Sequence, residues 1–320
     1  MPSLLRLDVN HPYTSLLAAF ISWKLLILTI ILFSPGRGYD TSTTVLPSFL
    51  DTPIPANFAQ RALRHLSTRV VRWDAIYFTQ IAQRGYIWEQ EWAFGWSHTW
   101  ILRVLGGFLA PWFGYVEVNT DVIAFGGVLL AHLSHWASVV VLYWLTNEVF
   151  KHEEVSKKRR LALLSGLLHV LSPAGVFLNA PYAEAGFALL NFLGMYGFVK
   201  AVGAYDEDRG AKGAVLSLLI GGIFGLATTV RGNGLFSGVM LIAYALETGM
   251  RLLRRDDKWK TRLLRPLAIG ASGILMAGIA FWPQILAYRE YCLDAEAEVV
   301  RPWCTSRVPS IYAWVQKDNW

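Results

Sequence analysis

The chain is organised around a stretch of charged and aromatic residues that runs from Arg72 to Trp96. It reads Arg72-Trp73-Asp74-Ala75-Ile76-Tyr77-Phe78, then Ile81-Ala82-Gln83-Arg84-Gly85-Tyr86, then Glu89-Gln90-Glu91-Trp92-Ala93-Phe94-Gly95-Trp96. A hydrophobic segment precedes it and a largely apolar sequence follows it. Asp74 is therefore a carboxylate among aromatic side chains at the edge of a membrane, and it is the first candidate for a chemical role.

The composition indicates a membrane protein. Of the 320 residues, 54% are hydrophobic and 16% are charged, whereas roughly 25% are charged in an average soluble domain. The mean hydropathy is +0.37. The 14 Trp, 13 Tyr and 17 Phe residues suit membrane interfaces. The net charge is +6, and the basic residues lie between apolar segments. Basic residues in such loops set the orientation of a membrane protein, so we do not expect nucleic-acid binding.

A membrane-spanning helix needs about 20 mostly apolar residues. Seven segments approach this requirement, near residues 15–34, 122–146, 161–178, 183–203, 214–230, 234–248 and 266–288. They predict an all-α polytopic membrane protein with about seven spans in a single membrane-embedded domain, residues 1–320. The shorter apolar segment 100–115, broken by glycines and a proline, is expected to be re-entrant or interfacial.

The distribution of basic residues predicts the orientation. If the basic loops 151–160 and 251–265 are cytosolic, the loop 35–121, the turns near 173–184 and 231–234 and the tail 289–320 lie on the opposite side. Within the long first loop, the spacing of apolar residues predicts an amphipathic helix over Arg61–Gln83. Several arginines of this helix oppose the orientation, but long loops cross membranes largely regardless of charge.

A group-transfer enzyme at a membrane surface needs a base and a cationic group for a phosphate leaving group. Asp74 is the candidate base, and its alternative role is a helix N-cap. Arg231, in a turn flanked by glycine, is the candidate phosphate ligand, and its alternative is a snorkelling arginine. Glu184, at a membrane edge, is either functional or simply faces water.

Other ionisable residues favour structural interpretations. Glu89 and Glu91 resemble solvated loop charges, and Lys24 an interhelical or snorkelled group. His132 and His135 have no third ligand in the sequence pattern, so we expect a packed pair and no metal site. Cys292 and Cys304 share the tail and could pair if the tail is lumenal, which leaves a structural role.

Several short motifs follow one another along most of the chain in the order of a known family. They are Trp73-Asp74-Ala75, Ile81-Ala82, Gly85-Tyr86, Glu89, Trp92-Ala93-Phe94, Ser172-Pro173-Ala174, Ala180-Pro181-Tyr182-Ala183-Glu184, Phe187-Ala188-Leu189-Leu190, Ala227-Thr228-Thr229-Val230-Arg231-Gly232-Asn233-Gly234-Leu235, Tyr291-Cys292, Pro302-Trp303-Cys304 and Pro309-Ser310-Ile311-Tyr312. Together they resemble the PIG-V family of endoplasmic-reticulum mannosyltransferases, and its fungal members in particular.

The resemblance implies a GT-C type bundle and an inverting α-1,6-mannosyltransferase. Such an enzyme takes dolichyl phosphate mannose as donor and adds the second mannose to the GPI precursor, with its active site facing the lumen of the endoplasmic reticulum. The implied partners are this donor, the precursor glycolipid, the membrane and a small membrane subunit. No cofactor, bound metal or nucleotide is implied.

The resemblance also suggests roles for individual residues. Trp73 and Asp74 become the catalytic pair, with Asp74 as the base. The residues implied to bind substrate are Arg231, Asn233, Glu184, Tyr182 and Glu89.

The sequence departs from the family pattern at a few places. Phe94-Gly95-Trp96-Ser97-His98 stands where the family has a Phe-Pro-rich run, and Gly232 stands where serine is common. The sequence ends at Trp320 where the family continues into further spans, so we expect a C-terminally shortened member. The alternative functions are another dolichyl-phosphate-sugar-dependent GT-C transferase, a polytopic lipid or solute transporter, and a non-catalytic subunit of a glycosylation complex.

Overall fold

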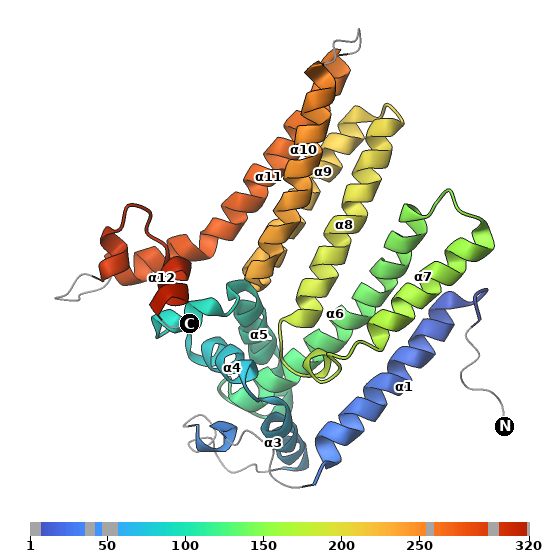
Figure 1. The fold of residues 1–320 in the computed structure, drawn as a ribbon. Coiled ribbons are helices and arrows are strands. Elements are labelled where there is room, and N and C mark those ends of the chain that lie inside the picture. The colour runs from blue at the N-terminus through green and yellow to red at the C-terminus, as the bar shows by residue number, and fades with distance from the viewer. Residues whose placement is uncertain (1–7, 36–41, 47–56, 254–258, 294–300, 319–320) are drawn as a thin grey trace.

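The computed structural model describes residues 8–35, 42–46, 57–253, 259–293 and 301–318 (Figure 1). Within these residues the regular secondary structure is entirely helical. The first loop, the basic loop 251–265 and the tail 289–320, all predicted above, each lie partly outside the described residues.

Six helices of the described part are long and apolar enough to cross a membrane. They are α1 (Pro12–Phe33), α6 (Thr120–Val149), α8 (Glu184–Asp206), α9 (Gly210–Val230), α10 (Phe236–Leu253) and α11 (Trp259–Tyr288). Each overlaps a segment that the sequence predicts as a span. The prediction of an all-α polytopic membrane protein is therefore confirmed.

The predicted segment 161–178 differs from the other six. It corresponds to α7 (Val155–Val170), followed by turns and the short helix η4 (Phe177–Asn179). Helix α7 has 16 residues, or about 24 Å of length, whereas the apolar core of a bilayer is about 30 Å thick. It packs against α6 and α1 at one side of the bundle (Figure 1).

Small residues let α9 pack closely against α8 and α11. A Cβ atom on Gly221 of α9 would lie 2.3 Å from the Ser272 carbonyl oxygen of α11. A Cβ atom on Gly194 of α8 would lie 2.2 Å from the Phe224 ring of α9. Close helix contacts of this kind are typical of membrane bundles, because small residues allow the backbones to approach. Helices α8 to α11 thus form one unit, and α6 joins it to α1 and α7 (Figure 1).

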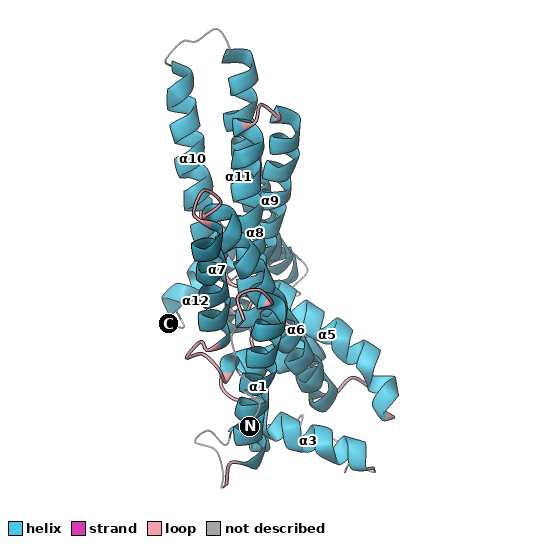
Figure 2. Cartoon of the chain, turned by 90° about the vertical axis from the view of Figure 1, so that its right-hand side faces the viewer, coloured by secondary structure: helices cyan, strands magenta, loops and turns pink. Residues whose placement is uncertain are grey.

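Three shorter helices lie at one end of the bundle (Figure 1): α3 (Phe58–Val70), α4 (Asp74–Arg84) and α5 (Trp96–Leu109). Figure 2 shows α3 and α5 at this end from the side. The single amphipathic helix expected over Arg61–Gln83 is wrong in its continuity, because the chain leaves helical geometry at residues 71–73. Its amphipathic character persists in α3, which buries Leu63, Ser67 and Val70.

The same end of the bundle carries the remaining elements of interest. These are η2 (Glu89–Ala93), η3 (Ala110–Phe113), η5 (Gly232–Leu235), the π-helical turn η6 (Arg289–Leu293), η7 (Pro302–Thr305) and α12 (Ile311–Asp318). The connections 150–154 and 207–209 and the far ends of α10 and α11 lie at the opposite end (Figure 1). The candidate residues therefore gather at one end of the molecule.

Candidate active site

Trp73 and Asp74 lie at the break between α3 and α4. Trp73 has φ 48° and ψ −123°, a backbone region that glycine adopts readily and that costs other residues roughly 1–3 kcal/mol. Asp74 is the first residue of α4, so its carboxylate lies at the positive end of the helix dipole. The N-cap position belongs to Trp73, so the alternative interpretation of Asp74 as an N-cap is wrong.

The Asp74 side chain is exposed. It makes no hydrogen bond and no ion pair with any residue in the part of the chain that the structure describes. A carboxylate in this state can accept a proton or a hydrogen bond from a bound molecule. The Trp73 indole beside it is 54% exposed.

Contacts from the segment before α8 hold this break in place. The Tyr182 hydroxyl donates a hydrogen bond to the Arg72 carbonyl oxygen at 2.8 Å. The Phe177 ring stacks on Trp73, with 6.2 Å between ring centroids, and meets Tyr182 edge-on at 5.0 Å. The buried Lys24 ammonium donates to the Leu178 carbonyl oxygen at 2.5 Å, so α1 in turn fixes this segment.

Glu184 and Arg231 form an ion pair between the start of α8 and the end of α9. Their side chains are 29% and 36% exposed. One guanidinium nitrogen of Arg231 bonds Glu184 Oε1, which leaves further N–H donors of Arg231 for an oxyanion. Glu184 Oε2 is buried and has no hydrogen-bond partner among the described residues.

His98 is a buried polar residue of the site that sequence reasoning did not select. Its Nε2 lies 3.3 Å from the Pro181 carbonyl oxygen, and its ring meets Phe78 edge-on at 4.8 Å. Burial lowers the pKa of His98 to about 4, and the charge of Arg231 acts in the same direction. His98 is thus a neutral imidazole that donates to the segment before α8. The only signal in the sequence was a polar residue within a short apolar helix.

Glu89 anchors the C-terminal tail. Its Oε1 accepts from Arg301 Nη1 at 2.7 Å and from Trp303 Nε1 at 2.9 Å, and its Oε2 accepts from Trp314 Nε1 at 2.8 Å. A disulfide between Cys292 and Cys304, with a Cα–Cα distance of 5.7 Å, closes the tail on itself. Glu89 thus occupies both of its oxygens with protein donors, unlike Asp74.

Two further carboxylates are committed to arginines of the first loop. Asp121 Oδ2 lies 2.8 Å from Arg64 Nε and ties α3 to α6. Glu91 bonds Arg84 at 2.5 Å and accepts from two backbone N–H groups. The expectation that Glu91 is a solvated charge is wrong, because it is 2% exposed.

No group of three or more His, Cys, Asp or Glu side chains within the described residues is arranged to hold a metal ion. His132 Nδ1 lies 2.7 Å from the Val128 carbonyl oxygen, and His135 Nε2 lies 3.3 Å from that of His169. The His135 and His169 rings meet edge-on at 4.9 Å. These contacts are those of packed, hydrogen-bonded histidines.

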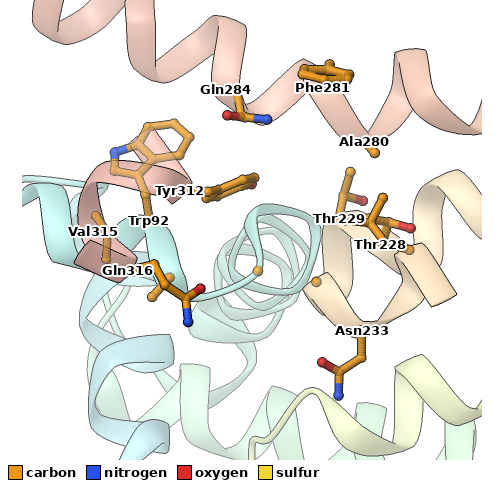
Figure 3. A pocket seen from close by; sticks show the side chains of 14 residues that line it. Trp92, Thr228, Thr229, Asn233, Ala280, Phe281, Gln284, Tyr312, Val315 and Gln316 are labelled. Atoms are coloured by element: carbon orange, nitrogen blue, oxygen red, sulfur yellow. The ribbon is translucent and has the colours of Figure 1, made fainter. Parts of the chain in front are cut away.

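A cavity of about 520 Å³ lies beside the turn that follows Arg231 (Figure 3). Its lining comprises Trp92, Ala93, Gly95, Thr228, Thr229, Gly232, Asn233, Leu235, Ala280, Phe281, Gln284, Tyr312, Val315 and Gln316. Asn233 is the one residue of the predicted set in this lining. Tyr182 bonds the Arg72 carbonyl oxygen before Trp73 and Asp74, and Glu184 pairs with Arg231. Glu89 holds the tail.

Comparison with protein families places the chain. Residues 14–320 match the family model described as Mannosyltransferase (PIG-V). The chain belongs to the PIG-V mannosyltransferase family. The resemblance inferred from the ordered motifs is thereby confirmed over nearly the whole chain.

Similar curated proteins bear the name GPI mannosyltransferase 2. One from Aspergillus oryzae is 36% identical over 318 residues, which cover 98% of this chain and 67% of the relative. One from Chaetomium globosum is 35% identical and covers 97% and 69%, and one from Gibberella zeae is 35% identical and covers 97% and 67%. The chain spans about two thirds of the length of these relatives. No solved structure matches it.

For a PIG-V mannosyltransferase, the geometry supplies two kinds of chemistry at the same end of the bundle. Asp74, a carboxylate with no partner among the described residues, lies next to an exposed indole, and a guanidinium with spare donors lies at the end of α9. A cavity with neutral lining begins at the residue after that guanidinium.

Proposed function

We propose that this chain transfers the second mannose, in α1,6 linkage, from dolichyl phosphate mannose to the precursor of the GPI anchor. The observation that carries the proposal is the similarity, along nearly the whole chain, to proteins named GPI mannosyltransferase 2. The reaction needs no cofactor in this proposal, because the lipid phosphate of the donor is already a leaving group.

Asp74 is the proposed base of this reaction. The acceptor hydroxyl oxygen attacks C1 of the donor mannose, and Asp74 takes the proton from that hydroxyl. The bond between C1 and the phosphate oxygen breaks, and its electron pair leaves with the lipid phosphate. One base is sufficient, and attack from the opposite face inverts C1. The carboxylate is exposed and has no partner among the described residues, which supports this role.

Arg231 is the proposed ligand of the phosphate. Its ion pair with Glu184 fixes the guanidinium while leaving donors that can meet phosphate oxygens. We propose that the Trp73 indole contacts the sugar ring at which Asp74 acts, since this indole is exposed beside the carboxylate. Tyr182 and Glu89 act in this proposal by positioning other elements, because protein partners already occupy their polar atoms.

We propose that this end of the molecule faces the lumen of the endoplasmic reticulum. The disulfide in the tail supports an oxidising compartment on that side. Basic residues at the opposite end, including Lys151, Lys157 and Lys158, support a cytosolic location there. Helices α3 and α5, at the end with Asp74, would then lie close to the lumenal membrane surface.

Complementation tests the proposed function. The protein is expressed from its own gene in cells that lack GPI mannosyltransferase 2, and GPI precursors are labelled with mannose and separated. We expect the precursor with one mannose to be converted to one with two. If the precursor keeps one mannose although the protein reaches the endoplasmic reticulum, the acceptor in this proposal is wrong.

A further inference from the structure

The cavity beside Arg231 is built where four parts of the chain meet (Figure 3). Trp92 of η2 and Tyr312 of α12 form one side, and Thr228 and Thr229 at the end of α9 form another. Helix α11 contributes Phe281 and Gln284 from above in the view, and Asn233 and Gln316 lie at the lower edge (Figure 3).

The lining is polar but uncharged. No lining residue carries a carboxylate, an ammonium, a guanidinium or an imidazole. The polar lining residues carry carboxamide and hydroxyl groups: Thr228, Thr229, Asn233, Gln284, Tyr312 and Gln316. Aromatic and aliphatic groups from Trp92, Phe281 and Leu235 complete the wall. The cavity's volume of about 520 Å³ lies within the range of about 300–1,000 Å³ typical of small-molecule sites.

Several of these polar groups are free to meet a ligand. Within the described residues, the carboxamides of Asn233 and Gln316 and the hydroxyl of Tyr312 form no hydrogen bond. Gln284 Oε1 accepts from Ser310 Oγ at 2.5 Å, so its amino group remains available. Burial raises the pKa of Tyr312 to about 12, so its hydroxyl keeps its proton at physiological pH and can donate.

This chemistry suits a saccharide. A carboxamide both donates and accepts, so it can bond adjacent sugar hydroxyls, which do the same. The exposed aromatic face of Phe281 can cover the apolar C–H face of a pyranose ring. A phosphate group would instead favour arginine or lysine donors, which this lining lacks.

The turn after α9 separates this neutral cavity from the charged groups of the site. Arg231 points to Glu184, whereas Gly232 and Asn233, the next residues, line the cavity. A phosphate-bearing donor therefore fits the side with Arg231. The other substrate of the proposed transfer, the glycolipid acceptor, then takes the cavity.

We propose that this cavity binds the uncharged hexose portion of the acceptor glycolipid, with Asn233, Gln284, Tyr312 and Gln316 as its hydrogen-bonding groups. This proposal rests on the proposed function. Glu89 and the disulfide hold the tail that supplies α12, and so they stabilise one wall of the saccharide site.

Steady-state kinetics with two substrates tests the proposal. Microsomes containing the protein are assayed with dolichyl phosphate mannose and a synthetic acceptor glycolipid that carries one mannose. Asn233→Ala and Gln316→Ala are expected to raise KM for the acceptor about tenfold and to leave KM for the donor unchanged. Lys317→Ala, on the same helix but outside the lining, is the matched control and should change neither.

Substitutions of opposite charge at one position identify the ligand's charge. Gln316→Lys and Gln316→Glu should both weaken binding of the acceptor and raise its KM, because each replaces the carboxamide with a charge in a site for a neutral ligand. If Gln316→Lys lowers KM for the donor and Gln316→Glu raises it, the cavity binds phosphate and the proposal is overturned. Unchanged acceptor KM in Asn233→Ala and Gln316→Ala, or equal changes for donor and acceptor, also overturns it. If the unsubstituted protein transfers no mannose at all, the proposed function itself fails instead.

Discussion

Trp73 and Asp74 owe their positions to residues that are distant in the sequence. Tyr182, which bonds the Arg72 carbonyl, is 110 residues away, and Phe177 stacks on Trp73. The strained backbone conformation of Trp73 persists because these tertiary contacts hold it in place. Sequence analysis could select Asp74, since a carboxylate among aromatic residues at a membrane edge is unusual. It could not predict the bond from Tyr182, because any residue offers the same backbone carbonyl.

The Tyr182→Phe substitution removes the hydroxyl that holds the Arg72 carbonyl. A hydrogen bond of this kind contributes roughly 1 kcal/mol, so we expect kcat to fall about fivefold with KM little changed. The measurement is steady-state mannosyl transfer in microsomes at matched protein amounts. Tyr196→Phe in α8, whose hydroxyl bonds no described residue, is the control. An unchanged kcat would show that the bond does not position Trp73 and Asp74.

The lowered pKa of His98 implies that the stability of the folded protein depends on pH. Its pKa is lowered from 6.5 to about 4 in the folded protein, so the unfolded chain binds the proton more readily between these values. Stability is therefore retained above about pH 7 and lost as the pH falls from 6.5 towards 4, by up to about 3 kcal/mol.

His98→Asn keeps a donor for the Pro181 carbonyl but does not titrate. Thermal unfolding of the detergent-solubilised protein should show a shallower loss of stability for this variant between pH 6.5 and 4 than for the unsubstituted protein. The difference between the two curves isolates His98 from the other histidines. Parallel curves would contradict the inferred pKa.

At the scale of elements, two interruptions shape the site. The break between α3 and α4 places Asp74 at a helix start, and the turn after α9 directs Arg231 and Asn233 to different neighbours. The spacing of apolar residues predicted helix over 61–83 but not its interruption. Periodicity reports which face is buried, and it is insensitive to a single residue with unusual φ such as Trp73.

The C-terminal tail is held in place by the Glu89 carboxylate. The sequence around Glu89 gave no sign of this contact. In Glu89→Gln, Arg301 and two indoles lose a charged acceptor, and we expect a loss of roughly 2 kcal/mol in the docking of the tail. Trypsin should then cut the tail faster in permeabilised microsomes. Glu153→Gln is the control, because the one ion pair of Glu153 among the described residues is with Lys157 at the surface, at 2.7 Å. Equal cleavage of the two variants would argue against the anchoring role.

At the scale of the whole molecule, hydropathy predicted most of the fold. Six of the predicted spans correspond to long apolar helices, because a bilayer demands continuous apolar length and internal backbone hydrogen bonding. The cavity could not be predicted in this way. Its walls come from η2, α9, α11 and α12, and neutral side chains such as Gln284 and Gln316 carry no distinctive signal in the sequence.

The proposed orientation predicts the labelling of introduced cysteines. Both native cysteines are paired, so the background of free thiols is absent. Glu153→Cys should react with a membrane-impermeant maleimide in sealed microsomes, whose outer face is cytosolic. Glu117→Cys, at the end of the bundle with Asp74, should react only after the membrane is opened with detergent. The reverse pattern would invert the topology and remove the lumenal site.

The role of Asp74 is the central claim, and its most direct test is the rate of mannosyl transfer at saturating donor and acceptor. We predict that Asp74→Asn lowers kcat by about 10²–10⁴-fold and leaves both KM values similar, and that Asp74→Glu retains part of the activity. Glu117→Gln, an exposed carboxylate in the same loop without a partner among the described residues, should behave like the unsubstituted protein. A kcat for Asp74→Asn within a few-fold of the unsubstituted enzyme would contradict the assignment of Asp74 as the base.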